Sequence, residues 1–549
     1  MKNLSFLIIG AGSRGNAYAR AISTSTPARI AAVAEPDSYK RRTLGQKYIW
    51  GTDSPKPSQE FEGWKEWIAY ETKRRSSSSD LSNGDTAEEA EGGVTGLLIC
   101  SLDETHITIL TALAEANLLD LHVLCEKPLA LSLSDCLSVY SARKHSDSNA
   151  VFSIGHVLRY SPHNLLLRRL VREQRVIGDI VSVEHTEPVG FWHFAHSYVR
   201  GNWRRETENG DGSLLTKSCH DVDFLLWLIE GPVYSTKAGT LADSGVNGVS
   251  IDKKSDSTLK LRSIHSTGHL TQFTPHHKPL AAGSATNCTT CPIERECIYS
   301  AVRIYRDNHL HQGLTGWPLK IVCPDIEDYT DPKDAETYLL STLKEEYDEN
   351  TLSYDEIGNR TWYGRCVWEC DNDVVDDQIV TLSWDTVPPS PPTSTSTSNP
   401  PKMRKPKNIP GITATLHMTA PTEAQCARRG RIYGTAGEIS YDSRTITIFS
   451  FATKETTTIE IPKQPPVEEE AHGGGDYGLA RGFVGAVDAV VNEGWDVERA
   501  QREFVGCSLD DVIKSHAVVF AAEESRRGER VVRWGEWWGG KLGGVGLSS

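Results

Sequence analysis

The sequence lacks two features, and each absence excludes a class of protein. No stretch of its 549 residues approaches the roughly 18–20 uninterrupted apolar residues of a membrane-spanning helix. Basic residues are in deficit, with 58 Lys+Arg against 73 Asp+Glu and a net charge of −15. This charge argues against sequence-independent binding of nucleic acid, which needs a concentrated basic face, and against docking on anionic membranes. We therefore expect neither nucleic acid nor a membrane as a partner.

Cysteine is also sparse, with 12 residues in the whole chain. Cys100, Cys125 and Cys136 stand singly in apolar runs, as reduced thiols in a protein core do. The apolar run near the first residue leads directly into a glycine-rich segment, without the small-residue cleavage site of a signal peptide. These patterns predict a cytoplasmic protein.

The first 150 residues alternate between apolar runs and helical patterns. The runs at 4–9, 30–34, 96–100 and 122–125 are typical of parallel strands that are buried on both faces. Residues 107–116 have helical spacing between two of these runs. Strands that alternate with helices form right-handed βαβ units. We therefore predict an α/β domain over residues 1–150, a Rossmann-type doubly wound parallel sheet.

Residues 151–535 are predicted to form a second, α+β domain. Residues 378–384 and 413–418 alternate apolar with polar side chains, which is typical of a large, mostly antiparallel open sheet with one wet face. Residues 213–229 are predicted to form one helix. Polar or Gly/Pro/Ser-rich composition predicts a mobile insertion at 71–93, loop insertions at 241–275, 325–360 and 387–410, and a Gly-rich tail at 536–549.

A glycine motif, Gly10-x-Gly12-x-x-Gly15, lies between the first predicted strand and the first predicted helix. In this context it predicts a dinucleotide site, with the pyrophosphate at the helix N-terminus. Glu35 ends the second strand 20 residues beyond Gly15, where a carboxylate accepts from the adenosine ribose and repels a 2′-phosphate. The cofactor is therefore predicted to be NAD. Arg41 and Arg42 soften that preference toward NADP, and a turn that needs glycine without binding a nucleotide is the competing interpretation.

Five further motifs follow the glycine motif in a characteristic order. The complete set is GAGSRG (10–15), SLDETH (101–106), CEKPLA (125–130), GHVLRY (155–160), IGDI (177–180) and GNWR (201–204). Together they resemble the Gfo/Idh/MocA oxidoreductases over most of residues 1–232. The resemblance implies NAD(P)-dependent hydride transfer at a carbinol or carbonyl carbon of a sugar, cyclitol or related polyol. It also implies homo-oligomers that assemble through the open sheet of the second domain.

The resemblance assigns roles to individual residues. Lys127 of the EKP motif is implied to contact both cofactor and substrate, and His220 matches the family's acid/base histidine. Many members carry Asp four residues before that histidine, but this sequence has Thr216 there. Lys217, three residues before His220, is expected to share its helical face and to favour neutral imidazole as a third catalytic group. The cofactor is expected to meet Gly10, Gly12, Ser13, Arg14, Gly15, Glu35, Ser101, Leu102, His106, Glu126 and Lys127, and the substrate to meet Arg159, Trp203, Arg204 and Asp223.

The departure at Thr216, together with the long insertions, leaves a second interpretation open. A catalytically inactive dinucleotide-binding regulator or scaffold can keep the same fold, because fold does not fix function. Retention of Lys127 and His220 favours the enzyme.

A separate group of cysteines has the spacing of a metal site. Cys288-x-x-Cys291 and Cys297 form a compact triplet, to which Cys366 would add a fourth thiolate. We predict a structural zinc ion bound by these four residues. Free thiols or a disulfide are competing interpretations. Other candidates for the fourth ligand are Cys323, Cys370, His276 and His277.

The segment AHGGGD (471–476) precedes an apolar helical run at 477–491. Asp476 is predicted to cap that helix. His472 is predicted to lie in a plain loop, with a place in the substrate cleft as the alternative.

Overall fold

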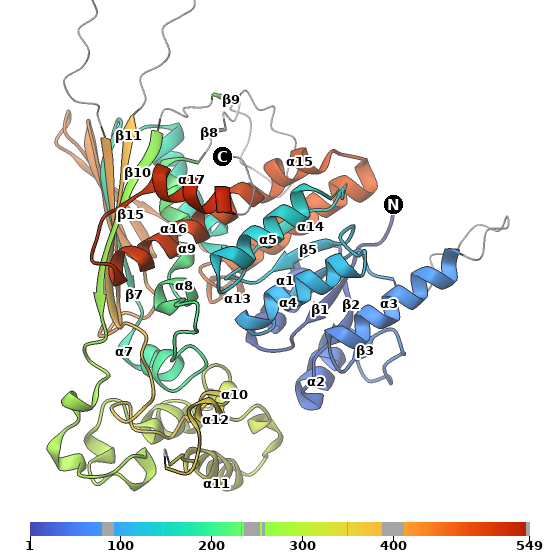
Figure 1. Cartoon of the computed structure of the whole chain (residues 1–549), viewed down its shortest axis with the longest axis vertical. Helices are drawn as coiled ribbons and strands as arrows, with labels where there is room; N and C mark the ends of the chain where they lie inside the picture. Colours follow the sequence, from blue (N-terminus) through green and yellow to red (C-terminus); the bar gives the residue numbers. More distant parts are fainter. Residues whose placement is uncertain are drawn as a thin grey trace, which may run out of the picture.

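The computed structural model describes residues 1–79, 93–146, 148–231, 233–234, 253–254, 259–348, 350–386 and 411–544. Two sheets stand side by side with helices packed between them, and residues 270–376 form a lobe beside the end of the second sheet (Figure 1). The loop predicted at 387–410 lies outside the described residues, as do 80–92 of the predicted insertion and 545–549 of the predicted tail.

The first sheet of the described chain has six parallel strands in the order β3-β2-β1-β4-β5-β6. The predicted doubly wound sheet is thus confirmed. The strand order reverses between β1 and β4, so the carboxyl ends of these strands open a crevice of the kind that binds ligands. The elements are β1 (Ser5–Ile9), α1 (Ser13–Ser25), β2 (Arg29–Ala34), α2 (Ser38–Tyr48), β3 (Glu60–Phe61), α3 (Trp64–Ser79), β4 (Gly96–Ile99), α4 (Asp103–Glu115), β5 (His122–Cys125), α5 (Leu133–Lys144) and β6 (Phe152–Ile154).

The second sheet has nine strands within the described residues, in the order β16-β15-β14-β13-β7-β12-β11-β10-β17. Only the β7–β12 pair is parallel, which confirms the prediction of a mostly antiparallel sheet. Alternate side chains of its strands are buried against helices α9 and α16. The strands are β7 (Ile180–Pro188), β10 (Leu259–His269), β11 (Asp377–Thr386), β12 (Gly411–Thr419), β13 (Arg429–Gly434), β14 (Gly437–Tyr441), β15 (Thr445–Ser450), β16 (Thr456–Glu460) and β17 (Val532–Arg533).

The remaining elements join the two sheets or build the lobe. β8 (Val233–Tyr234) and β9 (Lys253–Lys254) pair with each other. The helices are α6 (Pro162–Arg168), α7 (Phe191–Phe194), α8 (Gly212–Thr216), α9 (Cys219–Ile229), α10 (Leu319–Val322), α11 (Pro332–Leu343), α12 (Tyr354–Gly358), α13 (Pro466–Glu469), α14 (Gly475–Glu493), α15 (Val497–Ala500), α16 (Leu509–Arg527) and α17 (Trp534–Gly544).

Two segments that were predicted as insertions begin or end inside regular elements. Helix α3 continues to Ser79, because the buried carboxylate of Glu71 is paired with Arg74 and Arg75 on the next turn. Strand β10 occupies 259–269 of the predicted loop at 241–275. A strand with one exposed face needs apolar residues only at alternate positions, so its polar composition was misleading.

Two further segments predicted to be irregular are largely helical. The predicted loop at 325–360 contains α11 and α12, each held by a side-chain N-cap, Asp331 and Ser353 respectively. The predicted tail starts inside α17, where Trp534 stacks on Trp538 at 5.4 Å between ring centroids. The stacked aromatic rings supply the apolar contact that stabilises this helix, although its glycine content had predicted an irregular tail.

The predicted boundary after residue 150 is also displaced. Strand β6 belongs to the first sheet, and the C-terminal helix α14 packs against α1. Phe483 of α14 lies 5.6 Å from Phe6 of β1, between ring centroids, within one apolar core. The first domain is therefore completed by residues from the far end of the chain.

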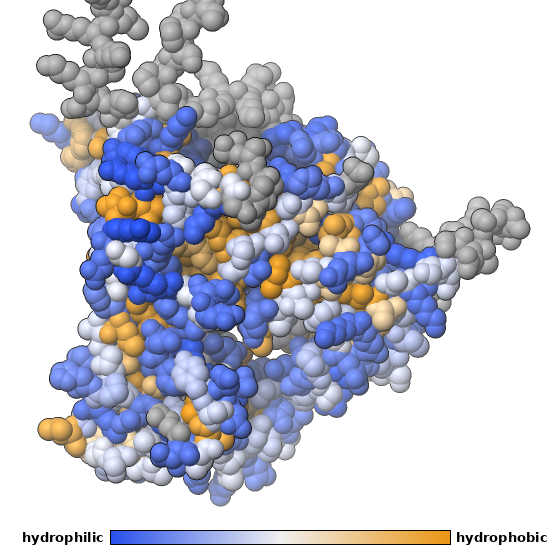
Figure 2. Space-filling model, viewed as in Figure 1, coloured by the Kyte–Doolittle hydropathy of each residue, from blue (hydrophilic) through white to orange (hydrophobic). Residues whose placement is uncertain are grey.

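No helix of the described chain is both long and apolar enough to cross a membrane. Hydrophilic residues cover most of the face in Figure 2, and hydrophobic ones gather toward its middle. Helices α5, α14 and α17 run through this middle region in the same view (Figure 1).

Candidate functional site

The glycine motif forms a tight turn between β1 and α1. Gly10 has φ +95°, and a Cβ there would lie 2.7 Å from the Cys100 backbone at the end of β4. A Cβ on Gly15 would lie 2.0 Å from the Gly10 carbonyl oxygen, so this glycine permits helix and strand to pack closely. Next to Gly12, in contrast, no atom of the described residues lies within 4 Å of an added Cβ. Gly12 is the N-cap of α1, so the space beside it adjoins the N-terminus of that helix, which begins at Ser13.

Glu35 ends β2 beside this turn. Its buried carboxylate accepts hydrogen bonds from the backbone N–H of Ala11 at 2.7 Å and of Asp37 at 3.0 Å. Arg41 donates to the Glu35 carbonyl and pairs with Glu60 at 2.8 Å. The carboxylate therefore lies against the glycine turn.

Arg14, expected to meet the cofactor, instead joins three distant parts of the chain. Its Nε donates to Glu126 at 2.7 Å, and its two terminal nitrogens donate to both oxygens of Asp476 at 2.9 Å. Tyr18 also donates to Glu126 at 2.7 Å. Burial raises the pKa of Asp476, but Arg14 and then His472 outweigh it and hold that pKa well below its ordinary value. Glu126 and Arg14 therefore brace the Gly-rich turn against the EKP motif.

Asp476 does not cap α14, contrary to the prediction. Gly474 is the N-cap, and Asp476 lies within the first turn with its carboxylate turned toward Arg14 and His472. The ion pair outweighs a capping bond because the buried Asp476 carboxylate needs a partner of opposite charge.

The loop after β4 forms the next wall of the site. His106 is buried, with its ring nitrogens 2.8 Å from the Pro128 carbonyl oxygen and 3.2 Å from that of Ser101. It thus ties this loop to the EKP motif, and it does not reach into the crevice. Leu102 is half exposed at the N-cap of α4.

Lys127 lies at the centre of the site. Its Nζ donates to the main-chain carbonyl of Thr216 at 2.7 Å and lies 6.0 Å from the centroid of the Trp203 ring. Trp203 is fixed by its own hydrogen bond to Asp103, at 2.9 Å. A lysine ammonium carries three donors, so the Thr216 carbonyl leaves others for a ligand. At the position where many family members carry Asp, this chain therefore offers a main-chain oxygen to Lys127.

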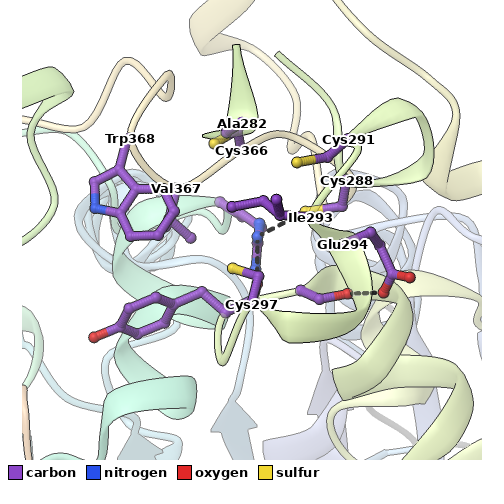
Figure 3. Close-up of a pocket in the computed structure, with 12 residues that line it drawn as sticks. Ala282, Cys288, Cys291, Ile293, Glu294, Cys297, Cys366, Val367 and Trp368 are labelled. Carbon is purple, nitrogen blue, oxygen red and sulfur yellow. Dashed lines mark hydrogen bonds between the residues drawn. The ribbon is translucent and has the colours of Figure 1, made fainter. Parts of the chain in front are cut away.

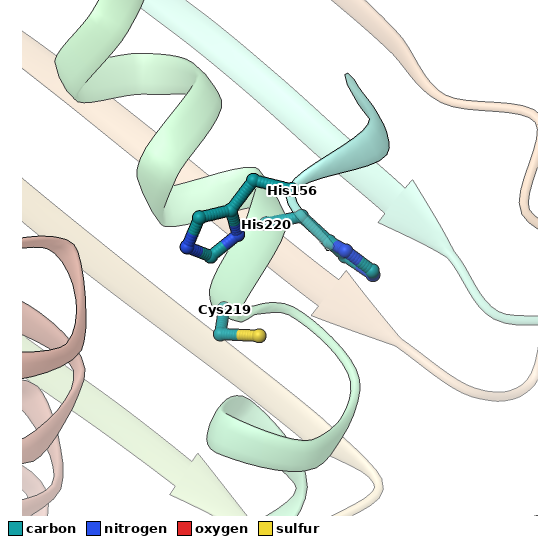
Figure 4. Close-up of side chains that lie close together, drawn as sticks. All are labelled: His156, Cys219 and His220. Atoms are coloured by element: carbon teal, nitrogen blue, oxygen red, sulfur yellow. The ribbon is translucent and has the colours of Figure 1, made fainter. Parts of the chain in front are cut away.

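His220 lies close to His156 and Cys219 (Figure 4). One ligand atom from each of the three lies within 4.8 Å of the others, and all three side chains are buried. Burial, and then the Lys127 ammonium, lowers the pKa of His220 well below its ordinary value. Burial raises the pKa of Cys219 to about 12. The trio has the donor types of a metal site, but a neutral thiol and a neighbouring ammonium disfavour a cation there.

Lys217 lies apart from His220, contrary to the prediction. The chain breaks its helix at Lys217 and Ser218, between α8 and α9, so Lys217 and His220 do not share a helical face. The Lys217 ammonium is 3.3 Å from the Glu187 carboxylate and 3.0 Å from the Cys426 sulfur. The cations that lower the pKa of His220 are Lys127 and, after it, Arg428.

Three of the four predicted substrate residues are buried in structural ion pairs. Arg159 donates through two nitrogens to both oxygens of Asp223, each at 2.7 Å, and this pair ties the turn at 157–160 to α9. Arg204 donates to Asp371 at 2.8 Å and to the carbonyls of Ile357 and Arg360. Each of the three side chains thus already has a partner within the protein. Trp203 alone of the four borders Lys127.

The four predicted metal ligands Cys288, Cys291, Cys297 and Cys366 line one cavity in the lobe (Figure 3). The cavity lies outside the Lys127 site. Within the described residues no three of these sulfurs lie all within 4.8 Å of one another, so they do not converge as they would around one zinc ion.

The sequence argument missed several residues of the site. His156 lies within the GHVLRY motif, and Cys219 directly precedes His220 in the sequence. Asp103 belongs to the SLDETH motif. Asp476 belongs to a segment that had been singled out for another reason. His516 of α16 accepts from the Leu129 N–H at 2.9 Å, and only the tertiary structure brings it to the EKP motif.

Comparisons with known proteins agree with this geometry. Residues 4–156 match the model of an oxidoreductase family with an NAD-binding Rossmann fold, and residues 170–252 match the C-terminal alpha/beta domain of the same family. Levoglucosan dehydrogenase, solved in complex with NADH and levoglucosan, superposes with a TM-score of 0.53 at 14% identity, over 97% of this chain and 99% of that one. At that identity the likeness shows the fold alone.

Two curated relatives are similar in sequence. The 2,7-anhydro-N-acetylneuraminate hydratase of Escherichia coli is 34% identical over 127 residues, which are 23% of this chain and 32% of that protein. Inositol 2-dehydrogenase 2 of Saccharopolyspora erythraea is 27% identical over 241 residues, 44% of this chain and 58% of that protein. The chain therefore spans less than two thirds of the length of either relative.

Proposed function

The chain belongs to the Gfo/Idh/MocA family of oxidoreductases, and we propose that it transfers a hydride between a nicotinamide dinucleotide and a polyol. The reacting carbon is a carbinol or carbonyl carbon of a sugar, cyclitol or related compound. The observation that carries this proposal is the position of Lys127 and His220 at the edge of the sheet where the glycine turn opens.

The dinucleotide fits the residues at this edge. The open space at Gly12 and the N-terminus of α1 accommodate a pyrophosphate. Glu35 would accept from the ribose 2′-OH, and its charge favours NAD over NADP. When bound, the nicotinamide supplies the hydride chemistry.

The side chains of the chain itself position the substrate and handle its proton. Lys127 has ammonium donors to spare, and these would polarise the reacting oxygen. The buried Nδ1 of His220 has no partner among the described residues and is neutral at pH 7, so it would accept the alcohol proton. The Trp203 ring would close one side of the space above Lys127.

The substrate class rests on the relatives. Inositol 2-dehydrogenase 2, levoglucosan dehydrogenase and 2,7-anhydro-N-acetylneuraminate hydratase are all named for cyclitols or anhydro sugars. We therefore propose a panel of inositols, anhydro sugars and their keto forms as the first substrates to examine.

Substitution of Lys127 by Ala tests the proposal. The purified protein is expected to bind NADH and to change its 340 nm absorbance when a member of the panel is turned over. Lys127→Ala should abolish turnover and keep NADH affinity within a few fold, whereas Lys144→Ala on the exposed face of α5 should change neither. Failure to bind either NADH or NADPH would overturn the proposal. Tight binding of dinucleotide without turnover of any polyol or ketone would favour a regulator on the same fold.

Two further properties accompany this proposal. We propose that copies of the chain associate through the open face of the second sheet, where Val181 of β7 and Ile379 of β11 are exposed. We also propose a reducing compartment, since all twelve cysteines are free. Light scattering in solution, with Val181→Lys as the disrupting variant, tests the assembly.

A further inference from the structure

The lobe at residues 270–376 contacts the first domain as well as the second sheet. The hydroxyl of Tyr39, in the first turn of α2, donates to the carboxylate of Asp328 in the lobe at 3.2 Å. Figure 1 shows α2 at the end of the first domain that is turned toward the lobe. We infer that Asp328 belongs to the dinucleotide site and selects NAD against NADP, an assignment that rests on the proposed function.

The position of α2 in the chain places this contact at the adenosine end of the site. Strand β2 ends at Ala34, Glu35 follows it, and α2 begins at Ser38. In a doubly wound sheet the ligand lies outside the carboxyl ends of the strands, with the adenosine ribose at the end of the second strand. Tyr39 is four residues beyond Glu35. A phosphate on the ribose 2′-oxygen would therefore extend toward the segment that carries Tyr39.

A second contact crosses the same edge of the sheet. Trp203, beside Lys127, donates its indole N–H to Asp103 at 2.9 Å, and Asp103 begins α4, the helix after β4. Because β1 lies between β2 and β4 in the sheet, the glycine turn after β1 lies between the two contacts. A bound dinucleotide would therefore have its pyrophosphate between them, with its adenosine on the Tyr39 side and its nicotinamide on the Lys127 side.

The basic residues at the start of α2 are the groups that could attract a 2′-phosphate. Arg41 is paired with Glu60 at 2.8 Å, and the Lys40 ammonium lies 3.8 Å from the N-cap carboxylate of its own helix. Arg42 is exposed and forms no ion pair within the described residues. Its guanidinium carbon lies 5.6 Å from the centroid of the Tyr39 ring. Arg42 is therefore the cation that a 2′-phosphate would meet.

Asp328 places a negative charge at the hydroxyl end of the same Tyr39 ring. Burial and then the Asp328 carboxylate raise the pKa of Tyr39, which is the direction expected of a donor to a charged acceptor. A 2′-phosphate attracted by Arg42 would be repelled by Asp328, whereas the uncharged 2′-OH of NAD would not. Since salt screens exposed charges, we expect Asp328 to lower the affinity for NADP by about three- to tenfold.

The tip of the lobe is held in place by its own contacts. Asp325 accepts from the Tyr338 hydroxyl at 2.7 Å, and the Tyr329 ring stacks on Tyr338 at 4.7 Å between centroids. Asp328 is exposed, and within the described residues its carboxylate accepts a hydrogen bond from Tyr39 alone. A packed part of the lobe thus carries this carboxylate and directs it at the first domain.

The affinities of the full-length protein for NADH and NADPH test the inference. Asp328→Asn keeps an acceptor for the Tyr39 hydroxyl and removes the charge. It should raise the affinity for NADPH about three- to tenfold, change that for NADH less than about twofold, and do so less at high salt. Arg42→Ala in the Asp328→Asn protein should remove the gain. The matched control is Asp334→Asn, an exposed carboxylate in the first turn of α11 of the same lobe, which should change neither affinity.

An unchanged ratio of the two affinities in Asp328→Asn would overturn the inference. An equal rise in Asp334→Asn would also overturn it, because the effect would then come from net charge alone. The inference and the proposed function fail separately. An unchanged ratio together with turnover of a polyol overturns the role of Asp328 alone, whereas a raised ratio without turnover of any polyol or ketone overturns hydride transfer alone.

Discussion

Arg14 and Asp476, 462 positions apart in the sequence, form a two-pronged ion pair with both nitrogen–oxygen distances at 2.9 Å. The pair joins α1, which follows the first strand, to α14, which lies between strands β16 and β17 of the second sheet in the sequence. It also orients Arg14 toward Glu126, the residue beside Lys127. The Gly-rich turn, the EKP motif and helix α14 are thus held together at one point.

Removal of the charge of Asp476 should therefore destabilise the protein. We expect Asp476→Asn to lower the free energy of unfolding by about 2–3 kcal/mol, because Arg14 stays paired with Glu126 but loses its second carboxylate. Urea denaturation measures this loss. As a control, Glu468→Gln removes the carboxylate of the Glu468–Arg481 pair, which is more exposed than the Arg14–Asp476 pair. This variant should lower the free energy of unfolding by at most about 1 kcal/mol. Since the folded pKa of Asp476 is depressed, the contribution is present above about pH 4 and is lost as the pH falls.

Substitutions of two glycines in the dinucleotide turn should have different effects, one on stability and the other on dinucleotide binding. Gly15→Ala places a Cβ 2.0 Å from the Gly10 carbonyl, so we expect a loss of about 1–3 kcal/mol or more in stability. Gly12→Ala meets no atom of the described chain and should fold normally. Its methyl group occupies the space of the pyrophosphate, so NADH affinity should fall at least about tenfold. Calorimetry of both variants measures stability and binding. Unchanged affinity in Gly12→Ala would contradict the assigned site.

Lys217 should matter for stability and not for proton transfer. Lys217→Met leaves the buried carboxylate of Glu187 with Arg428 as its one charged partner in the described chain. We expect a loss of about 3 kcal/mol in stability and an unchanged pH dependence of kcat. Glu187→Gln in the same chain should restore part of the stability. A shifted pH dependence of kcat in Lys217→Met would contradict this prediction and would indicate that Lys217 takes part in proton transfer.

Buried histidines should make the fold sensitive to mild acid. Burial lowers the pKa of His516 and of His196 to about 3 and that of His122 to about 4. The unfolded chain binds these protons near pH 6.5, so stability is full above that pH and is lost as the pH falls. Each histidine contributes a loss of about 1.4 kcal/mol per pH unit.

Thermal melts between pH 8 and 5 measure this effect. The midpoint should be level above about pH 6.5 and should fall below it. His516→Asn should flatten the slope, and His145→Asn, on the surface, should leave it unchanged. A level midpoint down to pH 5 would contradict the burial of these groups.

Local patterns in the sequence predicted the first domain well. Strands β1, β2, β4 and β5 are continuous apolar runs, and the glycine turn between β1 and α1 depends on neighbours in the chain. Features that depend on a short stretch of chain leave a readable signal.

Features that depend on partners far away in the sequence left no such signal. Arg14, Arg159, Arg204 and Lys217 were predicted to meet ligands, but each is paired with a carboxylate of the protein itself. A cationic side chain has the same sequence signature whether its partner is a substrate or a buried Asp. Strand β10 was missed because its polar face gives no apolar run.

The sequence by itself determined the Rossmann sheet, the glycine turn, the presence of Lys127 and His220, and the cysteine spacing, since these follow from short-range geometry and residue chemistry. The tertiary structure decided which charges remain open to a ligand. It paired Arg14 with Asp476 and Arg159 with Asp223, and it left the Nδ1 of His220 without a partner among the described residues. The physical reason is that a buried charge must find its counter-charge in three dimensions, and nothing in the local sequence names that partner.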